Sequence, residues 1–338
     1  MSLIRTATLL YGRDLHHLDH IGPLSIFLKI PLLVTEEAIA AIAKTYYPKI
    51  DVILLDRHTF AEKILASYDL IFTTLPKQIL DPLFFFEEHK QRKKLHTCWL
   101  PHGNSDKDNL GALTQEKLFL LYGKQMEDTL KQRGVQISHK TFIGNLRHHL
   151  YLENKKLFDK KAEEKIYFPK EQTTLFYAPT WGGPSLEEDL SFILKNLPSS
   201  YNLLVKMHPN TLHKGFVLSL KELYREKKNV VFIEDMPLIY PLLARSAIYI
   251  GDHSSIAYDF LSLDKPLFFL TDKRSPIHQA GRVVSKEELF SSLKEKDIFR
   301  EARETLDSYA FAKVNYEELP SQIWREINLY LEEELYFL

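Results

Sequence analysis

The sequence predicts an α/β protein made of two doubly wound, Rossmann-like domains, and three observations support this. The chain of 338 residues is longer than a typical single domain and suits two domains of about 150 residues each. Short apolar runs alternate with amphipathic stretches along the whole chain, a pattern typical of parallel strands that helices cover on both faces. A polar segment at 153–169 interrupts this alternation, which then restarts.

Each half of the chain has its own series of expected strands. They are 4–11, 51–55, 69–74, 95–100 and 117–122 in the first half, and 173–179, 202–208, 229–235, 247–252 and 266–271 in the second. Helices are expected between them, for example at 35–47 and at 59–68, where Thr59 caps the apolar period. We expect the segment 18–34 to form a packed helix and the aromatic run 83–88 to lie in the core.

The polar break sets the expected domain boundaries. We expect an N-terminal domain at 1–155, a C-terminal domain at 156–320 and a final amphipathic helix at 321–338 that could pack back on the first domain. Ligands of doubly wound domains bind at the carboxyl ends of the strands. Two such domains are therefore expected to face each other across a cleft that holds the site.

Composition excludes several classes of function. Hydrophobic residues make up 45% of the chain and charged residues 26%, as in ordinary globular proteins, and a net charge of −1 gives no electrostatic case for nucleic-acid binding. The single cysteine, Cys98, can form neither an internal disulfide nor a cysteine-rich metal site. No run approaches the roughly 18 apolar residues of a membrane span, and the N-terminus lacks the plan of a signal peptide. We expect a cytoplasmic protein that is soluble or peripheral on the inner face of the cell membrane.

The strongest candidate site is the segment 251–266. An expected strand ends at Gly251, Asp252 follows, and Ser254 or Ser255 is suited to cap the helix that begins there. Free N–H groups at a helix start, with hydroxyls beside them, bind anions, so the segment could cradle a diphosphate. A plain capped helix without a ligand is equally compatible with this pattern.

A second candidate lies at the end of the strand 202–208. Lys206 and His208 alternate there, so they share one face of the sheet and could neutralise a phosphate. The alternative is a lysine that reaches solvent and a histidine that belongs to a loop.

A third candidate follows the strand 95–100. Pro101 and Gly103 make a sharp exit that would present His102 as a general base for an acceptor hydroxyl. Because the chain has 14 histidines, a histidine that merely caps a turn is the competing interpretation.

Two further loops carry unusual residues. Thr180 and Trp181 follow a strand and precede two glycines, and they could form the wall of a nucleotide pocket or an ordinary loop. Gly144 and Arg147 follow another strand near the expected domain junction.

A histidine-rich segment near the N-terminus invites a metal interpretation. His16, His17 and His20 lie close in sequence to Asp14 and Asp19. We expect no metal site there, because the segment continues as the packed helix described above. Phosphate loops of the GxxxxGK[ST] type and HExxH metal spacing are also missing from the sequence.

Taken in order, these segments resemble the CDP-glycerol glycerophosphotransferase family of teichoic-acid primases and polymerases. The matching motifs are His102-Gly103, Gly144-Asn145-Leu146-Arg147, Tyr177 to Trp181, Lys206-Met207-His208-Pro209, Asp252-His253-Ser254-Ser255, Asp259-Phe260 and Lys265-Pro266. Their order and spacing fit the family across about 98–270. The chain departs from the family pattern at Leu146, where proline is usual, at Gly182, where arginine is common, and at His253, where an aromatic residue is usual.

The resemblance implies a GT-B fold with an acceptor-side N-terminal domain and a nucleotide-donor C-terminal domain. It implies a transferase that moves an alditol phosphate, glycerol phosphate above all, from a CDP-activated donor to an acceptor hydroxyl, which could be lipid-linked, and releases CMP. Peripheral contact with the membrane would suit such an acceptor, and no nucleic acid, metal or cofactor is expected to take part.

The expected site residues combine the motifs with this resemblance. His102 and His208 are expected to be catalytic, and the residues expected to bind the donor are Gly103, Arg147, Thr180, Trp181, Lys206, Asp252, Ser254 and Ser255. Two alternatives stay open: a GT-B glycosyltransferase that uses a nucleotide sugar, and a catalytically idle GT-B protein that only binds a ligand.

Overall fold

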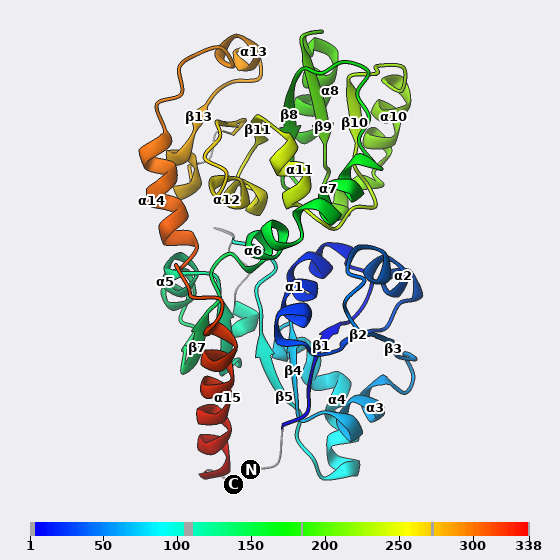
Figure 1. Cartoon of the computed structure of the whole chain (residues 1–338), viewed down its shortest axis with the longest axis vertical. Helices are drawn as coiled ribbons and strands as arrows, with labels where there is room; N and C mark the ends of the chain where they lie inside the picture. The colour runs from blue at the N-terminus through cyan, green and yellow to red at the C-terminus, as the bar shows by residue number, and fades with distance from the viewer. Residues whose placement is uncertain (1–3, 105–110, 184, 272–273, 337–338) are drawn as a thin grey trace. The chain divides into compact units, whose positions relative to one another are not determined.

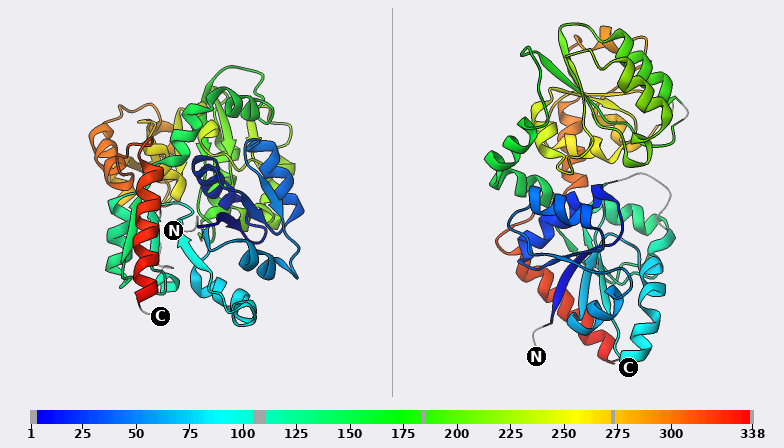
Figure 2. Two further views of the ribbon diagram at one scale, coloured as in Figure 1. Left: turned by 60° about the horizontal axis from the view of Figure 1, so that its bottom comes forward. Right: turned by 90° about the vertical axis from the view of Figure 1, so that its right-hand side faces the viewer.

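The structure of the protein is a computed structural model that describes residues 4–104, 111–183, 185–271 and 274–336. It divides into two compact units, which are considered separately (Figure 1). Of the residues described, the first unit comprises 4–103, 111–150 and 309–336, and the second comprises 104, 151–183, 185–271 and 274–308. Helices flank the strands of each unit (Figure 2).

The first unit is built on a parallel sheet with seven strands in its described part, in the order β3-β2-β1-β4-β5-β6-β7. These strands are β1 (Thr6–Leu10), β2 (Leu32–Val34), β3 (Val52–Leu54), β4 (Leu70–Thr73), β5 (His96–Trp99), β6 (Leu118–Leu121) and β7 (His139–Phe142). Every residue of β1 is buried, as expected for a strand that is covered on both faces. The strand order reverses between β1 and β4, and such switch points are where doubly wound sheets bind ligands.

The second unit repeats this plan with a parallel sheet of six described strands, in the order β10-β9-β8-β11-β12-β13. They are β8 (Thr173–Tyr177), β9 (Tyr201–Val205), β10 (Val230–Phe232), β11 (Ile248–Gly251), β12 (Leu267–Phe269) and β13 (Arg282–Val283). The order reverses between β8 and β11, which places the loops after these two strands at the switch point of this sheet.

Helices connect successive strands in both units. In the first they are η1 (Leu15–His17), α1 (Leu18–Leu28), α2 (Glu37–Tyr46), α3 (Phe60–Ser67), α4 (Lys77–Gln91), η2 (Gly111–Leu113), α5 (Lys124–Gln132) and α15 (Leu319–Tyr336). In the second they are α7 (Lys155–Glu163), α8 (Leu186–Asn196), α9 (Pro209–Leu212), α10 (Gly215–Leu223), α11 (Tyr240–Arg245), α12 (Ser255–Leu261), η3 (Pro276–Ala280) and α13 (Leu289–Ser292). Helices α6 (Leu146–Glu153) and α14 (Arg300–Ala310) carry the chain across the division between the units.

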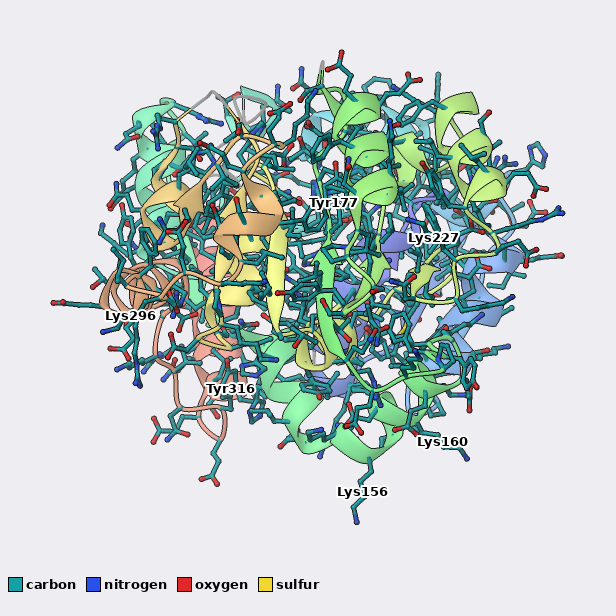
Figure 3. The ribbon with its side chains drawn as sticks, turned by 90° about the horizontal axis from the view of Figure 1, so that it is seen from above. Lys156, Lys160, Tyr177, Lys227, Lys296 and Tyr316 are labelled. Carbon is teal, nitrogen blue, oxygen red and sulfur yellow. The ribbon has the colours of Figure 1, made fainter. Side chains whose placement is uncertain are left out.

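Side-chain burial within the second unit follows the amphipathic pattern. Tyr177, the last residue of β8, is buried in the core at 1% exposure, whereas Lys156 and Lys160 of α7 point outward into solvent (Figure 3). The polar segment of the sequence therefore forms a solvated helix, α7, whose apolar side packs on the second unit through Phe158 and Ala162.

The doubly wound parallel fold is confirmed, but the segment 18–34 was wrongly expected to be one helix. Helix α1 ends at Leu28 because Lys29 adopts a left-handed conformation, with φ 55°. After Pro31 the chain continues as the buried strand β2, so a helix and a strand share one largely apolar stretch. Periodicity alone cannot separate the two when the strand is so short.

The expectation for the aromatic run 83–88 was also wrong in part. Phe84 is buried at 3% exposure, but Phe85 is 52% and Phe86 81% exposed on α4. A helix buries one stripe of side chains, so consecutive aromatic residues cannot all face the core.

The C-terminal segment joins the first unit earlier than the sequence indicated. The backbone N–H of Ala312 donates to the Tyr122 carbonyl at 2.9 Å, and a Cβ on Gly144 would lie 2.6 Å from the Ala312 carbonyl. Residues 309–320, placed in the C-terminal domain from the sequence, therefore pack on the first unit, because these contacts leave no periodic signal. Helix α15 then runs beside β7 (Figure 1).

One buried carboxyl group is expected to make the free energy of unfolding depend on pH. Burial raises the pKa of Glu116 to about 7, although its carboxylate accepts a hydrogen bond from the Lys77 backbone N–H. The folded state thus holds this proton more tightly than the unfolded chain, and stability falls as pH rises from about 4.5 to about 7. This pKa shift corresponds to a loss of about 3 kcal/mol in the free energy of unfolding.

Glu116→Gln is therefore expected to remove that loss and to raise the free energy of unfolding at pH 8 by up to about 3 kcal/mol. Urea unfolding at pH 5 and pH 8 measures the difference, with the exposed Glu37→Gln of α2 as the matched control. Equal pH dependence in wild type and Glu116→Gln would show that the carboxyl is not responsible.

Candidate active site

Three imidazoles gather at the carboxyl edge of the first sheet. His16 and His17 lie in η1, directly after β1, and His102 lies in the loop after β5. The ring of His17 stacks on that of His102 with centroids 4.5 Å apart, and His16 meets His17 edge-on at 4.3 Å. Their candidate ligand nitrogens all lie within 4.8 Å of one another.

Buried hydrogen bonds hold this cluster in place. Nδ1 of His17 lies 2.8 Å from the Thr74 hydroxyl, at the end of β4. The Tyr122 hydroxyl donates to the carbonyl of Pro101 at 2.9 Å, which fixes the residue before His102. His20 lies 2.5 Å from the same hydroxyl, and burial, reinforced by Arg147 and the three neighbouring histidines, holds its pKa well below the usual value.

The loop geometry presents His102 to solvent. His102 is exposed, whereas Pro101 before it is buried. Gly103 has φ 130°, a conformation that residues with a side chain rarely adopt, so the sharp exit after the strand depends on glycine. An exposed imidazole on a fixed loop is suited to accept a proton from a bound hydroxyl.

Arg147 lies in a different environment from the one the sequence suggested. Its Nη1 donates to Asp19 at 3.0 Å, and both side chains are buried within the first unit. The Tyr47 hydroxyl donates to the other oxygen of Asp19 at 3.0 Å. The contacts observed for Arg147 thus tie α6 to α1, and donor binding by this residue stays a prediction.

The second unit ties two loops together at its own switch point. Asp252, after β11, accepts hydrogen bonds from the Thr180 backbone N–H at 2.9 and 3.1 Å and from the Thr180 hydroxyl at 2.6 Å. The buried Tyr249 hydroxyl donates to the carbonyl of Ala178 at 2.9 Å. Together these bonds fix the loop that carries Trp181, whose side chain is 49% exposed.

Lys206 and His208 both follow β9, which ends at Val205, so the strand expected to reach 208 is shorter and His208 belongs to the loop before α9. The Lys206 ammonium donates to the Met236 carbonyl at 2.9 Å, and the His208 side chain caps α9 by accepting from the Asn210 N–H at 3.1 Å. The rings of His208 and Trp181 are 6.1 Å apart. An imidazole and an indole therefore lie near each other beyond the ends of β9 and β8, and Lys206 precedes that imidazole by two residues.

The helix that follows the serine pair is shorter, and so offers a weaker anion site, than the sequence suggested. Ser254 is a buried N-cap with an extended backbone, and Ser255 begins α12. This helix has only seven residues, so its dipole is small, and the hydroxyls and backbone N–H groups would have to bind an anion.

Two other residues of the family motif have structural contacts. The Lys265 ammonium donates to the carbonyls of Ala244 and Ser246 at 2.9 and 2.7 Å, which caps the end of α11. Asp259 accepts from the buried Tyr240 hydroxyl at 3.4 Å. Both residues therefore help to hold the second unit together.

The predicted residues divide between the two units. His102, Gly103 and Arg147 lie in the first unit, and Thr180, Trp181, Lys206, His208, Asp252, Ser254 and Ser255 lie in the second. The sequence analysis missed that His16 and His17 lie beside His102. The available signal was their position in the segment that follows β1, since the carboxyl ends of parallel strands meet at one sheet edge.

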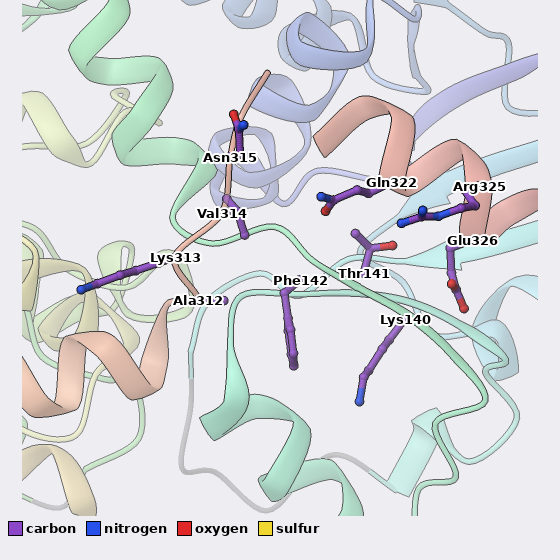
Figure 4. Close-up of a pocket in the computed structure, with 10 residues that line it drawn as sticks. All are labelled: Lys140, Thr141, Phe142, Ala312, Lys313, Val314, Asn315, Gln322, Arg325 and Glu326. Carbon is purple, nitrogen blue, oxygen red and sulfur yellow. The ribbon is translucent and has the colours of Figure 1, made fainter. Parts of the chain in front are cut away.

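A pocket of about 330 Å³ lies elsewhere, beside β7 and α15 in the first unit (Figure 4). Lys140, Lys313 and Arg325 are among its lining residues, but none of the predicted site residues is. Lys140 is already paired with Glu127. The pocket therefore gives no support to the predicted site.

Two parallel doubly wound sheets define a GT-B-like α/β protein, and solved structures share this fold. The wall teichoic acid polymerase TagF matches with a TM-score of 0.69 at 14% identity, covering 97% of this chain and 90% of that chain. UDP-GlcNAc 2-epimerase from Neisseria meningitidis matches with a TM-score of 0.54 at 14% identity, covering 98% and 99%. At these identities the similarity concerns the fold alone.

Sequence comparison identifies the family. The family described as CDP-Glycerol:Poly(glycerophosphate) glycerophosphotransferase matches residues 139–306, and the chain belongs to it. The resemblance noted in the motifs is thereby confirmed.

Curated relatives agree with this assignment. The teichoic acid glycerol-phosphate primase of Bacillus subtilis (strain 168) is 25% identical over 270 residues, covering 72% of this chain and 67% of the relative. The primase of that name from Bacillus spizizenii (strain ATCC 23059 / NRRL B-14472 / W23) is 32% identical over 114 residues, covering 32% of this chain and 28% of the relative. The second match thus spans less than a third of that relative's length.

Proposed function

We propose that the protein transfers glycerol phosphate from CDP-glycerol to an acceptor hydroxyl in teichoic-acid synthesis. The observation that carries this is the family match over 139–306, which includes the β8, β9 and β11 loops of the second unit. In the step, the acceptor oxygen bonds to the phosphorus that bears glycerol. The bond from that phosphorus to the bridging oxygen breaks, and CMP leaves with the electron pair.

The second unit is the proposed donor site. Ser254 and Ser255 would donate hydroxyl hydrogen bonds to the diphosphate, and Lys206 and His208 would balance its charge. Trp181 would cover the nucleotide, because an exposed indole on a fixed loop offers a flat apolar surface. Asp252 positions this loop through its bonds to Thr180.

The first unit is the proposed acceptor side. His102 would take the proton of the acceptor hydroxyl as the new bond to phosphorus forms. His17 stacks on its ring and would orient it. Cationic and hydroxyl side chains can stabilise the diphosphate in this scheme, so we expect the transfer to need neither a metal nor another cofactor.

The reaction class is tested by product analysis. With CDP-glycerol and a poly(glycerophosphate) acceptor, purified protein is expected to release CMP and to lengthen the acceptor. Release of CDP or UDP from a nucleotide sugar would instead indicate a glycosyltransferase. Absence of turnover with every donor, despite nucleotide binding, would indicate an idle binding protein.

Loss of the serine hydroxyls is expected to weaken donor binding. A hydrogen bond to a charged group contributes roughly 1.5–3 kcal/mol, so Ser254→Ala or Ser255→Ala should each raise the donor Kd about ten- to hundredfold. Titration calorimetry with CDP-glycerol measures this, and Ser291→Ala, exposed on α13, is the control. Normal donor affinity in the double variant Ser254→Ala/Ser255→Ala would contradict the assignment.

The side chains of α4 bear on the expected membrane contact. Among the helices described, none is long and apolar enough to cross a membrane. The basic run 89–94 is partly neutralised, since Lys90 pairs with Glu87 and Lys94 with Glu334. On the same helix, α4, Phe85 and Phe86 are exposed. We propose that these two rings, more than the basic charges, insert into an anionic bilayer.

Vesicle flotation decides this point. Wild-type protein is expected to float with vesicles that contain anionic lipid, and Phe85→Ser/Phe86→Ser is expected to remain in the dense fraction. Leu223→Ser, which removes a 70% exposed apolar side chain elsewhere, is the control. Equal flotation of wild type and the double variant would reject α4 as the contact.

A further inference from the structure

We propose that His16, His17 and His102 form a binding site for one divalent transition-metal ion of the zinc class. The ligand nitrogens of the three side chains lie within 4.8 Å of one another. With zinc–nitrogen bonds of ~2.1 Å, two nitrogens at a tetrahedral angle lie about 3.4 Å apart. Small side-chain rotations would therefore bring all three nitrogens to bonding distance of one ion.

The ring arrangement fits such a site. Centroid separations are 4.3 Å for His16 and His17, 4.5 Å for His17 and His102, and 5.8 Å for His16 and His102. The rings thus surround a common point instead of forming a continuous stack, because His16 lies edge-on to both of the others.

A neighbouring hydrogen bond strengthens the case. Metal-binding histidines usually donate the other ring N–H to a polar group, which fixes the tautomer and the ring orientation. Nδ1 of the buried His17 lies 2.8 Å from the Thr74 hydroxyl, so Nε2 would be its ligating atom. His102 is positioned by the bond between Tyr122 and Pro101.

The donor set decides the class of ion. Three imidazoles suit zinc, cobalt, nickel and copper, whereas magnesium and calcium prefer oxygen ligands. The carboxylate of Asp19, two residues after His17, accepts from Arg147 and Tyr47 and is not one of the clustered ligand groups. Three protein ligands leave a fourth position for water.

The site has a consequence for activity. An ion bonded to His102 occupies the nitrogen that would accept the acceptor's proton, so zinc is expected to inhibit the transfer and a chelator to leave it intact. This consequence rests on the proposed function, whereas metal binding itself does not.

The probe is Co²⁺, because zinc has a filled d shell and no visible spectrum. Chelator-treated full-length protein is expected to develop a visible absorption that saturates at one Co²⁺ per chain and that Zn²⁺ abolishes. His16→Ala and His102→Ala are expected to weaken Co²⁺ binding at least tenfold, and Thr74→Val about 10–100-fold. His58→Ala, at an exposed position outside the cluster, should bind Co²⁺ as the wild type does.

The outcomes separate the two proposals. No Co²⁺ absorption in the wild type, or unchanged affinity in a folded His102→Ala protein, would overturn the metal site; circular dichroism checks the fold, and His102 is exposed. Zinc binding without inhibition would leave the site standing and remove His102 as the base. Loss of transfer in His102→Ala, together with no metal binding by the wild type, would support His102 as the base and overturn the metal site.

Discussion

His102→Ala is expected to lower kcat for glycerol-phosphate transfer by about 10²–10⁴ and to leave the Kd for CDP-glycerol nearly unchanged. The imidazole is exposed on the acceptor-side unit, and Pro101 and Gly103 fix its loop. Its proposed contact is with the acceptor hydroxyl, so its loss affects the chemical step and not donor binding. Because the side chain is exposed, truncation should hardly change stability.

Two matched variants test this prediction. His208→Ala, in the donor unit, is expected to weaken donor binding as well as to slow turnover. His102→Asn keeps a polar side chain that can brace the loop but cannot act as a base near neutral pH. Single-turnover rates and donor titrations of the three variants distinguish these roles. Near-normal turnover in His102→Asn would show that His102 only stabilises its loop and is not the base.

The second large effect is expected at the buried ion pair of the first unit. Asp19→Ala or Arg147→Ala should each lower the free energy of unfolding by about 3–5 kcal/mol, because each leaves a buried charge without its partner. Both side chains are at most 8% exposed and lie 3.0 Å apart. In contrast, Glu62→Ala removes an exposed partner of Lys90 and should cost about 0–1 kcal/mol.

Urea unfolding, followed by a probe of the first unit, measures these differences. The apolar pair Asp19→Leu/Arg147→Met should recover much of the lost stability, since well-packed hydrophobic replacements of a buried pair are often neutral. The same proteins test the donor-binding prediction for Arg147. If Arg147→Ala is stable but binds CDP-glycerol weakly, Arg147 binds the donor and the structural interpretation fails.

Much of the fold could be predicted because parallel strands covered on both faces are recognisable as apolar runs. Strands β1, β4, β5 and β6 lie inside the expected ranges. Strand β2 was missed because it follows α1 within one largely apolar stretch, separated by a three-residue turn that begins with Lys29 in a left-handed conformation. The return of the chain to the first unit from Tyr309 was missed too, because its contacts are backbone contacts without periodicity.

The sequence by itself determined the doubly wound fold class and the family, because strand patterns and ordered motifs are local features of the chain. It also placed nearly every unusual polar cluster just after a strand. Only the tertiary structure decided which residues, far apart in sequence, each motif residue contacts. It paired Asp252 with Thr180 and Arg147 with Asp19, and it brought His16 and His17 to His102. These contacts join residues far apart in sequence, and the order of strands in each sheet, which no local pattern encodes, is what brings them together.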